Sequence, residues 1–120
     1  MKFYQAALSS IEDTVLETEY RSAHEIGVIR LGTSVLFFRV GFRHYYIPYH
    51  EIARCFRRVM EVPAKMCCGK GNFAIENLVI CDKEKELAVI QLPGTKAARI
   101  LMEELREKLP HALFRAPEAT

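Results

Sequence analysis

The amino-acid sequence predicts an α+β protein that is mainly β. The expected architecture is a curved antiparallel sheet or open barrel of about seven strands, capped by a carboxyl-terminal amphipathic helix. Two observations lead to this fold class. Apolar runs of strand length follow one another from residue 25 to residue 92. After residue 94 apolar residues recur every three or four positions, which is the period of a helix. A series of strands closed by one helix leaves few ways to bury both.

Length and composition indicate one domain with its own core. The chain has 120 residues, of which 50% are hydrophobic and 27% are charged. A chain of this size buries roughly two-thirds of the surface that its unfolded form exposes, so a core forms without disulfides or a structural metal. We therefore expect a single domain over residues 1–120, with a frayed tail at residues 116–120.

The first 24 residues fit two patterns. Apolar residues recur at helical spacing over residues 4–15, whereas residues 15–20 also alternate as a strand does. We expect residues 1–13 to form a short helix or an irregular lead, and a strand to follow over about residues 14–21.

The next strands are separated by clear turn signals. Residues 26–31 and 35–40 are apolar runs joined by Gly32-Thr33-Ser34, which predicts a hairpin. Residues 44–47 resume the pattern with aromatic and β-branched side chains. Pro48 lacks a backbone N–H, so it ends the ladder there or marks an edge.

A long strand and a second hairpin complete the sheet. In residues 53–62 the apolar side chains have both parities, which predicts a bulge or burial on both faces. Residues 63–72 contain two glycines and read as a loop. Residues 73–81 and 86–92 are strands joined by the charged turn at residues 82–85.

The helix is expected over residues 95–109. Thr95 is suited to the N-cap position and Pro110 stops the helix. The polar face carries Arg99, Glu103 and Arg106. The apolar face is formed by Ala98, Leu101, Met102, Leu105 and Leu109.

The cysteines predict neither a metal site nor a disulfide framework. Cys55 and Cys81 lie in apolar runs and are expected to pack as small hydrophobic side chains. The adjacent Cys67 and Cys68 cannot easily form two independent disulfides, and the paired spacing of a zinc site is absent. We expect no metal and no cofactor.

No catalytic motif is present either. The four histidines are scattered, and the sequence lacks H-E-x-x-H, G-x-S-x-G, C-x-x-C and a phosphate-binding loop. Catalysis needs a nucleophile, a base and an orienting group that converge. We expect no enzyme and no catalytic residues. The less favoured alternative is a thiol-based enzyme that places Cys67 or Cys68 near His50.

The charge distribution bears on partners and location. The net charge of +2 is low for a nucleic-acid binder, so nucleic acid is an unlikely partner. Residues 31–70 hold seven basic and two acidic residues, a net of +5. The longest dense apolar run, at residues 35–40, is too short to cross a bilayer, and the amino terminus lacks the pattern of a secretory signal. A cytoplasmic location is expected.

The order of elements resembles pleckstrin-homology-like domains, including the lipid-associated GRAM branch and bacterial branches. The residues that carry the resemblance are the run of strands, the phrase Ile47-Pro48-Tyr49-His50-Glu51-Ile52, and the closing hairpin with its helix, over about residues 14–110. The resemblance implies a binding module for phosphoinositides, peptides or proteins. Lipid-binding members carry a Lys-x-n-Arg pattern at the first hairpin, where this chain has only Arg30 and Arg39. No site is therefore carried over.

The candidate binding residues lie in the basic central third. Arg54, Phe56 and Arg58 share one face of their strand, whereas Arg57 lies on the other. Such a face suits an acidic peptide or a phosphate, but the arginines would equally cover apolar surface and pair with Glu51 or Glu61. The full set is Arg39, Arg43, His44, Tyr45, Tyr46, Arg54, Arg57 and Arg58.

We therefore expect a non-catalytic binding or scaffolding module that docks a protein or peptide partner. The alternative is salt-sensitive binding to anionic lipid at a membrane surface through the basic central third. The aromatic hairpin at residues 42–49 is expected to form a docking surface or a homodimer contact.

Overall fold

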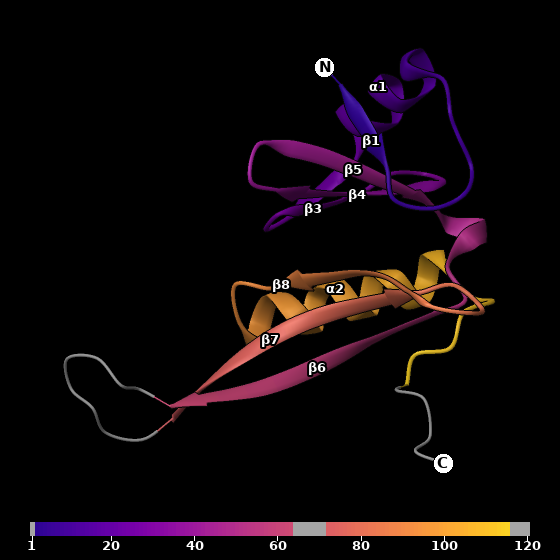
Figure 1. Cartoon of the computed structure of the whole chain (residues 1–120). Helices are drawn as coiled ribbons and strands as arrows, with labels where there is room; N and C mark the ends of the chain where they lie inside the picture. The colour runs from indigo at the N-terminus through magenta and orange to yellow at the C-terminus, as the bar shows by residue number, and fades with distance from the viewer. Residues whose placement is uncertain (1, 64–71, 116–120) are drawn as a thin grey trace.

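The computed structural model describes residues 2–63 and 72–115. These residues form eight strands, two α-helices and one short 3-10 helix, η1 (Figure 1). The elements in chain order are β1 (Phe3–Gln5), α1 (Asp13–Ser22), β2 (His24–Ile26), β3 (Ile29–Leu31), β4 (Val35–Val40), β5 (Arg43–Pro48), η1 (Tyr49–Glu51), β6 (Arg54–Pro63), β7 (Asn72–Cys81), β8 (Glu86–Gln91) and α2 (Thr95–Lys108).

The strands form two sheets. The first has the order β1-β5-β4-β3-β2 and the second the order β6-β7-β8. All neighbouring strands are antiparallel except β1, which pairs in parallel with β5. The α+β, mainly β class with a carboxyl-terminal helix is confirmed. The described strands number eight and form two sheets with no closed barrel, whereas about seven strands in a curved sheet or open barrel were expected.

The break between the sheets follows Pro48. Pro48 forms the last pair of the β4–β5 ladder, as expected from its missing N–H. η1 then turns the chain toward the second sheet (Figure 1). The buried hydroxyl of Tyr49 donates a hydrogen bond of 2.6 Å to the carbonyl of Gly32, which ties this turn to the β3–β4 hairpin. Burial raises the pKa of the Tyr49 phenol, so it remains a donor.

β4 is buried on both of its faces. Its first four residues are all buried, although a strand alternates its side chains between opposite faces. Leu36 and Phe38 belong to the main core, which the first sheet shares with the second sheet and α2. Val35 and Phe37 belong to a smaller core that α1 covers. Figure 1 shows α1 on the side of the first sheet that faces away from the second sheet.

The expected apolar face of the last helix is confirmed. All of its predicted members are buried, among them Leu101 and Leu105 with no exposed surface. The helix begins at Thr95, so the predicted N-cap role of Thr95 is wrong: the preceding Gly94, in extended conformation, takes that position. The N–H of Ala98 donates to the Gly94 carbonyl at 3.0 Å. The cap therefore lies one residue before the position predicted for it, and Thr95 is the first helical residue.

The strand expected over residues 14–21 is wrong, because this segment forms α1. Leu16 and Tyr20 are four residues apart and pack together on the smaller core, whereas Val15 is half exposed. The helical pattern of the first residues thus continues to Ser22. Residues 3–5, expected within the lead, form β1 along the edge of β5.

The run at residues 26–31 is two strands instead of one. Gly27 adopts a positive φ of 61°, a conformation that glycine reaches without strain. The chain therefore turns, and Ile26 pairs with Ile29 in the β2–β3 hairpin. The hairpin at Gly32-Thr33-Ser34 is confirmed, with the Gly32 N–H donating to the Val35 carbonyl at 2.9 Å.

The strands of the second sheet match their prediction closely. The β6–β7 register runs from Arg54 opposite Cys81 to Pro63 opposite Asn72 without a shift, so a bulge in β6 is wrong. Burial on both faces is confirmed, because Cys55 and Phe56 are both buried. The one register shift lies between β7 and β8.

The predictions for the two connections that flank β7 have different outcomes. Most of the loop predicted at residues 63–72 lies outside the described residues, as do residues 116–120, where fraying was predicted, and Cys67 and Cys68. The charged turn at residues 82–85 is confirmed. The carboxylate of Asp82 accepts the N–H groups of Glu84 and Lys85, both at 2.7 Å, and these bonds lower the pKa of Asp82.

Replacing Leu101 by alanine tests the shared core. The side chain has no exposed surface and packs with residues of both sheets, so Leu101→Ala should lower the free energy of unfolding by about 2–5 kcal/mol. Its neighbour Ile100 is 40% exposed, and Ile100→Ala should change it by less than about 1 kcal/mol. Urea denaturation followed by circular dichroism measures both. Equal losses would show that α2 is not anchored by this face.

Candidate functional site

The outer edge of β6 is covered only at its start. Leu113, in the segment after α2, forms an isolated parallel β-bridge with Arg54. Its N–H donates to the Ala53 carbonyl at 3.0 Å, and its carbonyl accepts the N–H of Cys55 at 2.9 Å. Among the described residues no further backbone follows Leu113 along this edge.

The strand geometry leaves unused hydrogen-bonding groups there. Backbone groups of a strand point alternately to its two sides, and the N–H of Cys55 points to the outer side. The N–H groups of Arg57 and Val59 therefore also point outward, away from β7. An open edge of this kind is a template on which another strand can pair.

A groove of about 310 Å³ lies beside this edge. Three parts of the chain form it: β6, the polar face of α2, and the segment after α2. We call it the β6–α2 groove. Its lining residues are Phe56, Arg57, Arg99, Met102, Glu103, Arg106, Phe114 and Arg115.

The charge of the groove is mostly positive, with four guanidinium groups and one carboxylate. Arg57 is paired with Glu76, a glutamate that is only 6% exposed. Arg106 lies over the ring of Phe114, 5.8 Å from its centroid. Arg99 has no hydrogen-bond or ion-pair partner among the described residues. The groove therefore combines apolar contact surface with cations that can pair with acidic groups.

The other predicted arginines of β6 hold neighbouring parts of the chain. Arg54 donates to the carbonyl of Arg115 at 2.7 Å, which fixes the segment after α2. Arg58 pairs with Glu86 at 2.8 Å and lies over the ring of Phe56. Among the described side chains, Arg57 and Arg58 thus pair with Glu76 and Glu86 instead of the expected Glu51, and the side chain of the other expected partner, Glu61, lies outside the described part of the structure.

The remaining predicted residues lie on the other sheet. Arg39 and His44 line a separate pocket, and Arg43 lies at the exposed end of the β4–β5 hairpin over the ring of Tyr4. Tyr45 is half-buried and stacked on Phe38, with ring centroids 5.3 Å apart.

Tyr46 does not belong to an open surface. It is 3% exposed, and its hydroxyl accepts the N–H of Ile11 at 3.2 Å. The eight predicted residues therefore do not form one surface. The fold brings Arg39 and His44 together in one pocket of the first sheet, whereas Arg54, Arg57 and Arg58 lie along β6 and only Arg57 lines the groove.

Sequence reasoning missed the α2 side of the groove. The helical period already placed Arg99, Glu103 and Arg106 on one polar face. The missing information was which strand edge lies beside that face. Phe114 and Arg115 carried no periodic signal, because they follow Pro110 in an irregular segment.

The described residues offer no grouping suited to metal binding. Within residues 2–63 and 72–115, no three His, Cys, Asp or Glu side chains are close enough together to hold a metal ion. His111 is used for structure, with its Nε2 atom 3.1 Å from the carbonyls of both Tyr49 and Ile52. The Cys67 or Cys68 constellation with His50 lies outside the described residues.

Comparison with known proteins gives no relative: no family model, no curated protein and no solved structure matches this chain. Neither helix of the described segments, with 10 and 14 residues, has the length and apolar character needed to cross a bilayer.

The two described thiols should be unreactive in the folded protein. Cys55 and Cys81 are buried, as expected. Burial, and then the neighbouring Cys81, raise the pKa of Cys55 from its ordinary value of 9.0 to about 12. The stability that the protonated Cys55 thiol contributes is present below pH 9.0 and is lost as the pH rises toward 12.

Iodoacetamide at about pH 8 should label neither thiol until the chain is unfolded. Peptide mass spectrometry measures this, and rapid native labelling of Cys55 would contradict it.

Proposed function

We propose that this protein is a non-catalytic binding module that docks an extended, acidic segment of a partner protein in the β6–α2 groove. The partner segment pairs its backbone with the outer edge of β6 and directs carboxylates toward the arginines of α2. The observation that carries the proposal is the open β6 edge beside a groove rich in arginine.

Backbone pairing supplies affinity in this arrangement. Strand addition joins the N–H and C=O groups of a peptide to those of an exposed edge, whatever the peptide's sequence. The outward N–H groups of Arg57 and Val59 are available for this among the described residues. Leu113 forms an isolated parallel bridge at the start of the same edge, which supports the proposal that a further extended segment pairs there.

Side chains supply specificity. Arg99 has no hydrogen-bond or ion-pair partner in the described part of the chain, and Arg106 lies over the ring of Phe114. Both therefore present positive charge along the groove. Arginine and aromatic side chains are enriched at the centres of protein interfaces, and Phe56 and Phe114 provide the aromatic part. An acidic segment with apolar residues between its carboxylates matches this lining.

The proposal extends to the fold family. We propose a pleckstrin-homology-like architecture, in the form suggested by the order of elements. It is supported by four consecutive antiparallel strands, β2 to β5, then three, β6 to β8, and then a helix packed on both sheets. Docking of peptides is one of the functions that this resemblance implies, and the groove lies between a strand of the second sheet and that helix.

A defined peptide tests the groove. The probe is a fluorescein-labelled peptide of alternating valine and glutamate, whose binding is followed by fluorescence anisotropy. Replacing its glutamates by lysine, or methylating alternate backbone nitrogens to block strand pairing, should each weaken binding at least about tenfold. The double variant Arg99→Glu, Arg106→Glu should weaken it by a similar factor.

The matched control is Lys83→Glu, Lys85→Glu, which makes the same change of charge in the exposed turn between β7 and β8 and should alter affinity less than about twofold. Equal binding of the methylated peptide would exclude strand addition, and an unaffected α2 variant would exclude the groove. A dimer by light scattering that binds no peptide, and that Val59→Pro dissociates, would identify a second copy of the chain as the occupant.

A second candidate function has one specific observation in its favour. The end of the β4–β5 hairpin exposes Val40 and Phe42, the latter completely, between Arg39 and Arg43. Apolar side chains flanked by cations suit the interface of an anionic membrane, where each Lys or Arg contributes about 1 kcal/mol. The hydrogen bond that Arg43 donates to the Tyr45 oxygen, and then the nearby Tyr4, raise the pKa of Arg43, which therefore stays charged.

Vesicle sedimentation tests this second candidate. Binding to vesicles that contain phosphatidylserine, compared with pure phosphatidylcholine, should fall at least about tenfold in Phe42→Ser and decrease as salt rises. The control Leu8→Ser removes another exposed apolar side chain, far along the sequence, and should bind as the unaltered protein does. Failure of the unaltered protein to bind the anionic vesicles would reject membrane binding and leave the peptide proposal standing.

A further inference from the structure

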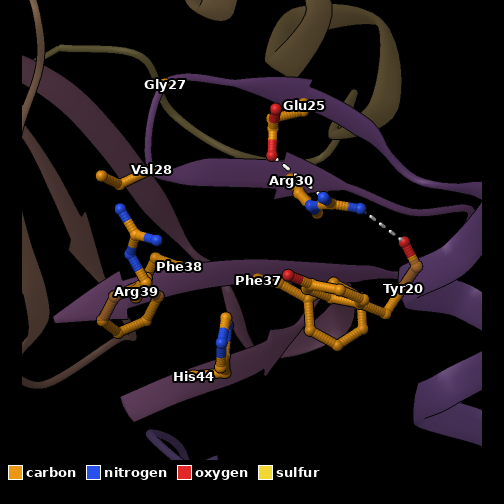
Figure 2. Close-up of a pocket in the computed structure, with 9 residues that line it drawn as sticks. All are labelled: Tyr20, Glu25, Gly27, Val28, Arg30, Phe37, Phe38, Arg39 and His44. Carbon is orange, nitrogen blue, oxygen red and sulfur yellow. Dashed lines mark hydrogen bonds and ion pairs between the residues drawn. The ribbon is translucent and has the colours of Figure 1, made fainter. Parts of the chain in front are cut away.

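A second pocket, of about 290 Å³, lies on the outer face of the first sheet (Figure 2). It opens where the cover of α1 ends. Its floor comes from β3, β4 and β5, and its wall comes from Tyr20 of α1. The β2–β3 hairpin completes it with Glu25 and Gly27.

The strand register explains why basic side chains meet there. Arg39 of β4 pairs directly with His44 of β5, and Phe37 pairs with Arg30 of β3. Phe37 and Arg39 are two residues apart, so they share the outer face of the sheet. The N–H of Arg39 donates to the Val28 carbonyl at 3.0 Å, which holds the β3–β4 ladder beside the pocket.

Aromatic contacts make the pocket rigid. The ring of Tyr20 meets the rings of Phe37 and His44 edge-on, with centroids 5.3 and 5.6 Å apart. His44 also packs against Phe3, at 6.5 Å. Two elements, α1 and β1, thus orient the imidazole, and little conformational entropy is lost when it binds a ligand.

The charged side chains around the pocket differ in whether they already have a partner within the protein. Arg30 pairs with Glu25 at 3.0 Å, donates to the Tyr20 carbonyl at 3.4 Å and lies over the Tyr20 ring (Figure 2). Glu25 is therefore neutralised by Arg30. The side chain of Arg39 has no hydrogen-bond or ion-pair partner among the described residues, and Arg39 pairs with His44 across the β4–β5 ladder. One free guanidinium and one oriented imidazole remain.

We propose that this pocket binds a phosphate group, held by the guanidinium of Arg39 and the imidazole of His44. Arginine donates two parallel hydrogen bonds to phosphate, and a histidine nitrogen adds a third from the neighbouring strand. Tyr20 closes the side of the pocket. This site lies on the opposite sheet from the β6–α2 groove and does not depend on it. The phosphate belongs either to a soluble phosphate ester or to a lipid headgroup, which present the same chemistry.

Titration with inorganic phosphate and phenyl phosphate, followed by ¹H–¹⁵N spectra of the full chain, tests the proposal. The shifts should concentrate on the amides of Val28, Arg39 and His44. Arg39→Gln and His44→Gln should each weaken phenyl phosphate binding, the former about tenfold. Arg21→Gln removes the same charge from an exposed position on α1 and should leave the affinity unchanged.

The remaining measurements assign the source of the phosphate. If the chain binds phenyl phosphate but not phosphatidic acid vesicles, the pocket takes a soluble phosphate ester. If binding is confined to phosphatidic acid vesicles and is lost in Phe42→Ser, the pocket takes a lipid headgroup. Either result supports a phosphate site, provided that Arg39→Gln weakens the binding and Arg21→Gln does not. The proposal is overturned if no phosphate probe binds, or if Arg39→Gln and Arg21→Gln have the same effect.

Discussion

Burial of β4 on both faces is the constraint on which the rest of the structure depends. Residues 35–38 are four consecutive buried apolar residues in a strand, so each face of the first sheet needs its own cover. On one face Leu16 and Tyr20 of α1 supply it. On the other face the second sheet and α2 share a core with Leu36 and Phe38. The layered arrangement in Figure 1 follows from these two requirements.

Both candidate sites lie where these covers end. α1 is ten residues long and covers the outer face only as far as Tyr20, so the same face of β4 continues to Arg39 in an open pocket. On the second sheet, the part of the segment after α2 that the structure describes covers the β6 edge as far as Cys55. Polar groups at such borders keep access to water while a rigid apolar layer holds them in place. These are the properties that ligand recognition needs.

Much of the fold was predictable because its signals are local. Hairpin turns, the charged turn at Asp82, the end of the ladder at Pro48 and the buried face of α2 each depend on residues that are close in sequence. The errors occurred where local patterns were ambiguous. The apolar residues around residues 14–21 fitted both the helical spacing and the alternation of a strand. Packing of Leu16 with the residues of β4 in the smaller core selected the helix. A single glycine, Gly27, turned one expected strand into two.

The candidate sites were predictable only in part. The sequence by itself determined the fold class, the closing amphipathic helix, the burial of Cys55 and Cys81, and the clustering of basic residues in the central third. Only the tertiary structure decided which of those residues meet. Strand register placed Arg39 beside His44, and the packing of α2 placed Arg99 beside the β6 edge. The physical reason is that charge and periodicity are properties of neighbouring residues, whereas a binding site is made by long-range contacts that exist only once the core has formed.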